Sequence, residues 1–233
     1  MGVFRGMTGR LRDRTRHRLC SELRKMGLDA QVAKRGQPEE GIAGGLMGTS
    51  LGLIEIRGSL IRWINLLEHP GSRYASTTYT NVYVVPDVQV RSGGYLELRS
   101  ARVRDASVYG RVVDLRWTAN FVGTRVAAAS GQGRDEEAES DLLRRVTEDV
   151  ALKEGLIGLN EDITVRSVPN YWCWAISSGS YQEGGLGPKS RRLAPSREQW
   201  DCYQAIARHL LEFSEQGWEA KERKGKRGRS RKS

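Results

Sequence analysis

The hydrophobic positions near the N-terminus recur at helical spacing. Leu11, Leu19 and Leu23 lie eight and four residues apart, and Gly27 can end a helix in a left-handed conformation. Residues 8–26 are therefore expected to form a helix. The intervening positions are rich in arginine, so the pattern predicts one face packed on the body and a cationic face in solvent.

Further along the chain the spacing of hydrophobic positions shifts toward two, which is typical of strands. Val113, Leu115 and Trp117 share one face, for example, while Asp114 and Arg116 share the other. Short turns join most of these segments and favour antiparallel pairing. The expected strands are residues 28–34, 51–57, 60–67, 77–85, 95–103, 108–117, 163–168 and 172–177.

Two more helices are predicted among or after these strands. Residues 134–157 begin with an acidic turn that complements the helix dipole, followed by an apolar stripe. The last helix follows Ser196, which forms a Ser-x-x-Gln capping box with Gln199, and it is expected to end near Gly217.

Together these elements predict an α+β fold with an N-terminal basic helix, a mainly antiparallel sheet of about five to seven strands, and two later helices packing on it. Residues 1–36 provide the basic helix and the first strand, and residues 37–220 the α+β body. Residues 221–233 form a basic tail that is too charged and too poor in apolar residues to fold alone, so we expect it to be disordered.

Charge is distributed unevenly along the chain. The formal net charge is +10, yet residues 1–36 and residues 221–233 each carry +7, which leaves −4 for the body between them. A slightly acidic body with two cationic ends is typical of a protein that holds a polyanion. The side chains expected to contact phosphates are Arg10, Arg12, Arg14, Arg16, Arg18, Lys224, Lys226, Arg227, Arg229, Arg231 and Lys232.

One short segment suggests a different activity. Pro86-Asp87 is followed by Glu97-Leu98-Arg99, and this pattern resembles the motif of the PD-(D/E)xK nuclease superfamily. The resemblance covers residues 86–99 and implies that Asp87 and Glu97 hold Mg²⁺, with Arg99 in the place of the family's lysine. A guanidinium stays protonated, so Arg99 can hold a phosphate but cannot act as a base. Asp87 would open a strand over residues 88–91, and the alternative is an ordinary hairpin.

The aromatic cluster Tyr171-Trp172-Cys173-Trp174 allows two interpretations. On a strand, Trp172 and Trp174 would share one face. That face could stack against unpaired bases, or it could fill the core against Trp200 and Tyr203 of the last helix. We expect core packing, because large aromatic side chains are usually mostly buried.

Other chemistry is sparse. The three cysteines, Cys20, Cys173 and Cys202, are far apart and form no metal-ligand pattern, so we expect no metal site, no cofactor and a reducing, cytoplasmic location. No apolar run approaches the length of a transmembrane helix.

These observations favour a nucleic-acid-binding protein without catalytic activity, with DNA and RNA both open. Two alternatives remain. The first is a Mg²⁺-dependent nuclease, or a degenerate relative of one, that uses Asp87 and Glu97. The second is an interaction subunit whose cationic ends dock on an acidic protein partner.

Overall fold

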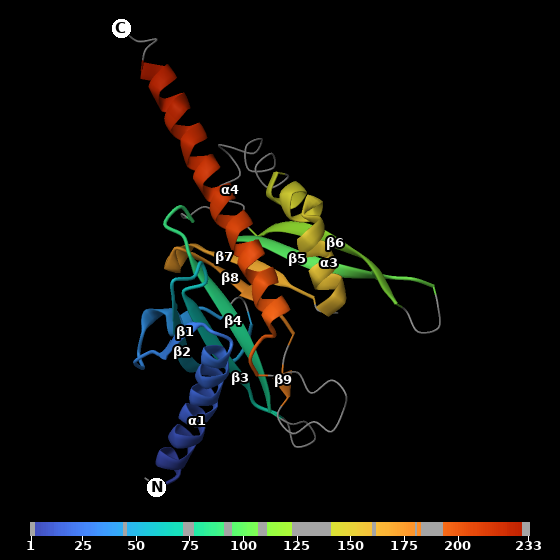
Figure 1. The fold of residues 1–233 in the computed structure, drawn as a ribbon. Coiled ribbons are helices and arrows are strands. Elements are labelled where there is room, and N and C mark those ends of the chain that lie inside the picture. The colour runs from blue at the N-terminus through green and yellow to red at the C-terminus, as the bar shows by residue number, and fades with distance from the viewer. Residues whose placement is uncertain are drawn as a thin grey trace.

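Nine antiparallel strands pair into one sheet in the computed structural model of the chain (Figure 1). Their spatial order is β1-β2-β3-β4-β8-β7-β5-β6, and β9 pairs with β4. The strands are β1 Asp29–Val32, β2 Thr49–Arg57, β3 Trp63–His69, β4 Thr78–Pro86, β5 Tyr95–Arg104, β6 Val112–Val122, β7 Thr164–Val168, β8 Cys173–Ser177 and β9 Tyr181–Gln182.

The structure describes residues 3–43, 46–71, 77–90, 95–106, 111–122, 141–159, 162–179, 181–182 and 193–229. Within these ranges, side chains are described from residue 13 to residue 214, apart from those of residues 95, 121, 122, 181 and 182. The helices are α1 Val3–Lys25, α3 Val150–Leu159 and α4 Arg197–Arg229, a helical segment at residues 141–148, and the short 3₁₀ helices η1 Pro38–Gly41 and η2 Pro169–Tyr171.

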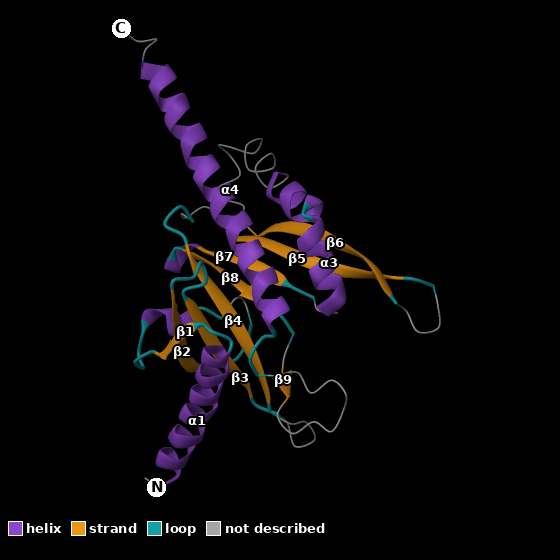
Figure 2. Ribbon diagram, in the orientation of Figure 1, coloured by secondary structure: helices purple, strands orange, loops and turns teal. Residues whose placement is uncertain are grey.

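The main core lies between the sheet and the helices, with α4 over the middle strands and α3 over β5 and β6 (Figure 2). The ring of Tyr83 on β4 lies 4.4 Å between centroids from that of Tyr203 on α4 in a tilted arrangement, and meets Trp200 edge-on at 6.3 Å. Aromatic pairs of this kind add to the stabilisation from burial alone. The predicted partner of Trp200 and Tyr203 was the strand that contains Trp174, whereas their aromatic partner is Tyr83.

A smaller core lies on the opposite face of the sheet. It joins Ile42 to Val82, Val84, Cys173 and Ala175, so the segment that contains η1 covers this half of the face. Asn65, fully buried on β3, holds the segment in place. Its side-chain amide donates to the carbonyl oxygens of Glu40 (3.0 Å) and Ile42 (2.9 Å). A buried amide with both donors satisfied costs little and fixes the path of the loop.

The ends of the chain point away from each other (Figure 1). Arg197, in the first turn of α4, donates a 2.6 Å hydrogen bond from Nη2 to the carbonyl oxygen of Met26, just after α1. From this junction α1 extends toward the N-terminus at one end of the molecule, and α4 toward the C-terminus at the other. At a rise of 1.5 Å per residue, α1 and α4 are about 35 Å and about 50 Å long.

The α+β class and the N-terminal and later helices are confirmed, but the sheet has more strands than the expected five to seven. The β7–β8 hairpin lies between β4 and β5. It thereby joins strands β1 to β4 and strands β5 and β6 into one sheet. Two capping predictions also hold, the glycine that ends α1 and the capping box of α4. Gly27 has a φ of 85°, Ser196 N donates to Gln199 Oε1 at 2.6 Å, and Gln199 N donates to Ser196 Oγ at 3.2 Å.

Some predicted boundaries are wrong. The helix expected over residues 134–157 is interrupted at Asp149, whose Oδ1 accepts the backbone N–H of Leu152 and thereby caps α3. The acidic turn predicted for that helix lies outside the described residues. α4 continues beyond Gly217 to Arg229, so the backbone of the basic tail is helical up to that residue. A helix propagates readily from a packed segment into the residues that follow it. The composition of the tail alone did not indicate this extension.

Candidate nucleic-acid interface

Arg16 is buried, although the sequence placed it among the phosphate contacts. Its side chain reaches from α1 to the segment after β1, where Nη1 donates to the carbonyl oxygen of Ala33 at 3.1 Å. Its Nη2 pairs with Asp13, one turn earlier on α1, at 3.1 Å. Only 4% of the residue is exposed, and burial, together with the nearby Arg35, lowers the pKa of its guanidinium. Arg16 therefore stabilises the fold and is not available to a phosphate. Sequence reasoning could have found this, because Leu19, three residues later, lies on the same helix face.

Space for the Arg16 guanidinium comes from Gly52. This glycine lies at an irregularity in the β2–β3 register and has a φ of 105°, a conformation that L side chains rarely adopt. A Cβ at this position would collide with the Arg16 guanidinium and approach that of Arg35. A glycine in β2 and an arginine in α1 thus occupy complementary volumes.

The remaining arginines of α1 differ in how far they can serve an interface. Arg14 and Arg18 are exposed, and Arg18 forms a 3.2 Å ion pair with Glu22 one turn later. Exposed pairs of this kind are weak and exchange easily for a stronger anion. The side chains of Arg10 and Arg12 lie outside the described residues.

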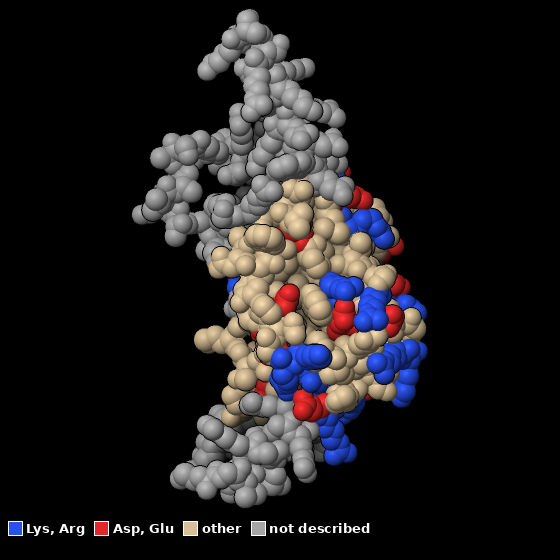
Figure 3. All heavy atoms as spheres, turned by 90° about the vertical axis from the view of Figure 1, so that its left-hand side faces the viewer, with Lys and Arg blue, Asp and Glu red and all other residues tan. Residues whose placement is uncertain are grey.

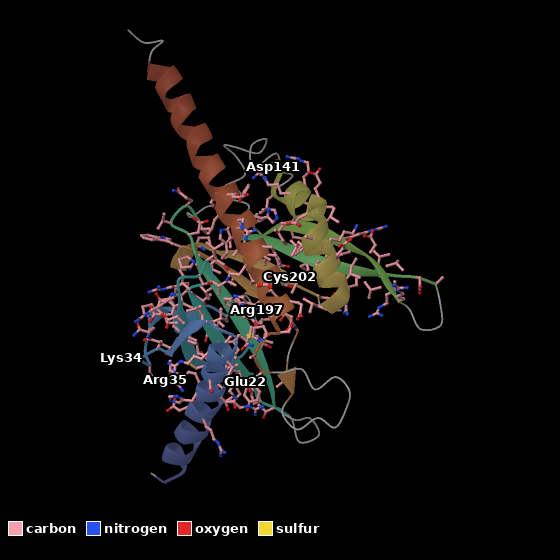
Figure 4. The ribbon with its side chains drawn as sticks, in the orientation of Figure 1. Glu22, Lys34, Arg35, Asp141, Arg197 and Cys202 are labelled. Carbon is pink, nitrogen blue, oxygen red and sulfur yellow. The ribbon has the colours of Figure 1, made fainter. Side chains whose placement is uncertain are left out.

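Basic side chains near α1 are interspersed with acidic ones on the described surface. Lys34 and Arg35 follow β1 and lie beside α1 (Figure 4). Arg35 pairs with Asp13 at 3.2 Å, and Arg62, just before β3, pairs with Glu55 of β2 at 2.5 Å. Figure 3 shows the same alternation of basic and acidic side chains across this side of the molecule. The body therefore presents mixed charge here, in keeping with its net charge of −4 in the sequence.

The basic residues of the tail fall at the far end of α4. Lys224, Lys226, Arg227 and Arg229 belong to the helix, while Arg231 and Lys232 follow it outside the described residues; the side chains of all six are not described. The last described side-chain contact of α4 with the sheet is at Ser214, whose Oγ donates to Asp87 at 2.5 Å. Beyond that contact the helix carries the tail away from the body (Figure 1).

Asp87 is buried and its hydrogen bonds are internal. Oδ2 accepts from Trp174 Nε1 at 2.8 Å and from the hydroxyl of Ser214, and Oδ1 accepts from the backbone N–H of Gln89 at 2.8 Å. Among the described residues 88–90, no part of the strand expected over residues 88–91 forms, and residue 91 lies outside the described residues. Val88 and Gln89 form a turn, because the Asp87 carboxylate and carbonyl accept the next backbone donors and fold the chain back on itself.

Glu97 lies on the other face of the sheet. The residue is 5% exposed, and its carboxylate is paired with Arg99 on its own strand and with Arg166 on β7. Glu97 pairs in register with Arg166 of β7, and Arg166 pairs with Ala175 of β8. Ala175 belongs to the smaller core, so Glu97 lies on that face of the sheet. Arg99 is 55% exposed in its side chain and covers the Glu97 carboxylate from solvent.

Asp87 and Glu97 are therefore not brought together. Asp87 binds Trp174, which belongs to the main core, whereas Glu97 shares a face with Ala175 of the smaller core. Two strands, β8 and β7, also separate the β4 end from β5. Carboxylates that hold one Mg²⁺ must converge on it, so these residues do not fit the metal site that the sequence resemblance implies. Among the described side chains, no group of three His, Cys, Asp or Glu could hold a metal ion.

The two tryptophans of the aromatic cluster have opposite environments. Trp174 is 3% exposed and packs edge-on against Phe213 of α4 at 6.4 Å between ring centroids. Trp172 is 62% exposed and precedes the strand, which begins at Cys173. The prediction of core packing is confirmed for Trp174, and the prediction that both rings share one face is wrong. The cause is local: Trp172 caps η2 with a φ of 49°, which breaks the strand alternation.

The cysteine thiols are free and buried. Burial raises the pKa of Cys173 to about 12 and that of Cys202 to about 11, so neither is a thiolate near neutral pH. None of the described helices is long and apolar enough to cross a membrane. Comparison of the chain with family models, curated proteins and solved structures found no match.

Proposed function

We propose that the protein binds nucleic acid through α1 and the basic end of α4 and catalyses no reaction of its own. The observation that carries the proposal is the placement of the charge. The net positive charge is confined to two ends of the chain, and both ends belong to helices that extend away from a body with a net negative charge. Each basic side chain that meets a phosphate releases condensed counterions, which favours binding without reading a base sequence.

The proposed contacts differ from the sequence prediction in two respects. Arg16 is left out because it is buried, so Arg10, Arg12, Arg14 and Arg18 are the α1 contacts. The second difference is spatial, since the α1 and α4 contacts lie at opposite ends of the molecule and would meet phosphates that are far apart on the polymer. The buried free thiols are in keeping with a reducing compartment, and a cytoplasmic location is part of the same proposal.

A salt titration tests the proposal. The affinity of the full chain for a fluorescent 40-nucleotide single strand, and for duplexes of DNA and of RNA, is measured by anisotropy between 50 and 200 mM NaCl. If six to ten phosphates are neutralised, the affinity is expected to fall by roughly 10³–10⁵ across this range. An affinity that does not change with salt contradicts the proposal.

Matched variants locate the contacts. Deletion of residues 221–233 and the double variant Arg14→Gln/Arg18→Gln should each weaken binding to all probes alike and lower the salt dependence. Arg144→Gln is the control, because Arg144 is also exposed but belongs to the helical segment 141–148, outside α1 and α4, where it pairs with Asp141 and Glu148. If the control and the α1 variant lose the same affinity, binding depends on the total charge of the protein and not on the charges at its ends.

Competition distinguishes an acidic protein partner. Poly-glutamate of matched total charge is added to the preformed complex with the single strand. We expect weak competition, because flexible carboxylates lack the spacing and density of phosphates on a polynucleotide. If poly-glutamate binds as tightly as any nucleic acid, the protein is better described as an interaction subunit for acidic partners.

A further inference from the structure

Trp172 combines two unusual properties. It is a bulky residue with a positive φ of 49° and ψ of 55°, and among the described residues it is the only one other than glycine with a positive φ. It also leaves 62% of its surface in solvent. Large residues avoid this conformation because the side chain crowds the backbone, so a positive φ at a tryptophan is a true outlier. The chain holds an aromatic ring in solvent by means of a conformation that is unfavourable in itself.

The surrounding hydrogen bonds keep this conformation in place. The backbone N–H of Trp172 donates to the carbonyl oxygen of Pro169 at 3.1 Å, and its carbonyl oxygen accepts from the backbone N–H of Asp87 at 2.8 Å. Cys173, the next residue, is buried and paired in the sheet on both sides. The peptide groups that flank Trp172 are thus fixed, and the ring is presented from a rigid support.

Two other exposed side chains belong to residues that are adjacent in sequence to Trp172 or to its hydrogen-bond partner Asp87. Tyr171 is 39% exposed, and its hydroxyl end lies against Gly41 of η1, where a Cβ would collide with it. Val88, next to Asp87, is 65% exposed. The site therefore presents Trp172, Tyr171 and Val88 as exposed hydrophobic residues.

The same residue that supports Trp172 also anchors α4. Asp87 holds the Trp172 carbonyl with its N–H, and its Oδ2 accepts the hydroxyl of Ser214. The basic tail begins seven residues after Ser214, about 10 Å further along the helix. Asp87 therefore contacts both the residue that carries the exposed ring and the helix that continues into the basic tail.

We propose that Trp172 is a stacking site for an unpaired base of single-stranded nucleic acid whose phosphates are held by the basic end of α4. The inference rests on the proposed nucleic-acid binding and names its substrate class. An exposed aromatic ring beside a cationic track is the combination that binds single strands with little sequence preference, because every base has a face that can stack. The bases of a duplex are already stacked on each other, so Trp172 distinguishes single strands from duplexes.

Trp172→Gly is the decisive variant. Glycine adopts a positive φ without strain, so this variant keeps the backbone of η2 and β8 while it removes the ring. A melting curve no worse than that of the wild type confirms that the fold is retained. Trp172→Tyr retains an aromatic ring of smaller area and serves as the second variant, and Val88→Ala is the control for loss of exposed apolar surface next to Asp87.

The affinity for a 20-nucleotide oligothymidylate and for a 20-base-pair duplex is measured for each variant at one salt concentration. For Trp172→Gly we expect the affinity for the single strand to fall by roughly 5- to 150-fold, with the duplex affinity unchanged. Trp172→Tyr should retain most of the single-strand affinity, and Val88→Ala should retain all of it.

The outcomes separate this inference from the function on which it rests. If the wild type binds both probes with strong salt dependence and Trp172→Gly binds the single strand as tightly, stacking is wrong and nucleic-acid binding stands. Equal losses on single strand and duplex also overturn stacking. If the wild type binds neither probe, the proposed function itself fails. Should Trp172→Gly not fold, full single-strand affinity in a folded Trp172→Ala protein would overturn the proposal.

Discussion

The indole Nε1 of Trp174 donates a 2.8 Å hydrogen bond to Oδ2 of Asp87, and both side chains are almost completely buried. The bond joins β8 to the end of β4, two adjacent strands, and the same carboxylate oxygen reaches Ser214 on α4. A carboxylate that the sequence marked as a metal ligand is therefore the point at which two strands and a helix are tied together.

Replacement of Trp174 should be severely destabilising. Trp174→Ala removes a ring that packs on Phe213 and leaves a cavity, so we expect the free energy of unfolding to fall by about 3–5 kcal/mol in urea denaturation. Trp172→Ala is the matched control, because that ring is mostly in solvent and its loss should have little effect on stability. A Trp174→Ala protein as stable as the wild type would show that the ring is not part of the core.

Asp87 should matter for stability and not for catalysis. Asp87→Ala leaves the donors of Trp174, Gln89 and Ser214 without their acceptor, and one such buried donor costs about 1–3 kcal/mol. We expect a lower midpoint in urea, with Asp87→Asn less affected because its amide oxygen still accepts. Incubation of plasmid with Mg²⁺ or Mn²⁺ is the second measurement. Cleavage by the wild type that Asp87→Ala abolishes, in a variant shown to be folded, would contradict the structural role.

Arg16 and Arg18 should separate stability from binding, although they lie two residues apart. Arg16→Ala removes buried hydrogen bonds of a charged group and should lower the free energy of unfolding by about 2–3 kcal/mol. Arg18→Ala should leave the melting temperature nearly unchanged, because its ion pair with Glu22 is exposed, and should weaken nucleic-acid binding. The reverse result, a stable Arg16→Ala protein with weakened binding, would return Arg16 to the interface.

Alkaline pH should destabilise the protein through Cys173. Burial holds its pKa at about 12 in the folded chain, against an ordinary thiol value of 9.0, so the thiol is protonated in both states below pH 9. Between pH 9 and pH 12 the thiol ionises only in the unfolded state. The contribution of Cys173 to stability is therefore lost as pH rises, with a limiting slope of about 1.4 kcal/mol per pH unit.

The measurement is urea denaturation at several pH values with Cys173→Ala as reference. The difference in slope between the two proteins isolates the thiol from tyrosine and lysine titration. A reaction with Ellman's reagent at pH 8 gives an independent check, since the native thiols should react slowly and all three should react in guanidinium. Fast reaction of the native protein would mean that Cys173 is accessible.

Sequence patterns predicted the features that depend on neighbours in the chain. Ser196 and Gln199 lie three residues apart in one helical turn, so their reciprocal capping follows from the sequence alone. The β7–β8 pairing likewise follows from two short apolar strands separated by a turn. Trp172 could not be placed in this way, because the alternation of residues 172–177 is compatible with a strand that begins one residue earlier. Its exposure depends on η2 and on the distant Asp87.

Long-range pairing explains the other differences. The Pro-Asp and Glu-x-Arg pattern carries no information about sheet order, and the insertion of β7 and β8 between β4 and β5 separates Asp87 from Glu97 by two strands. Leu96 and Leu98 lie in the main core, and Glu97 between them lies on the opposite face of the sheet. Its burial results from Arg166 on β7, a partner about 70 residues away in sequence that periodicity cannot identify.

The volume shared by Gly52 and Arg16 has a consequence for how this chain can change over generations. Any side chain at position 52 would displace the guanidinium of Arg16 and would itself be held at a φ that only glycine tolerates well. A smaller residue at position 16 would remove the first obstacle and leave the second. Mutational drift is therefore expected to be asymmetric: position 16 can change while Gly52 is kept, but Gly52 cannot be replaced first. Among descendants of this sequence, the glycine should outlast the arginine.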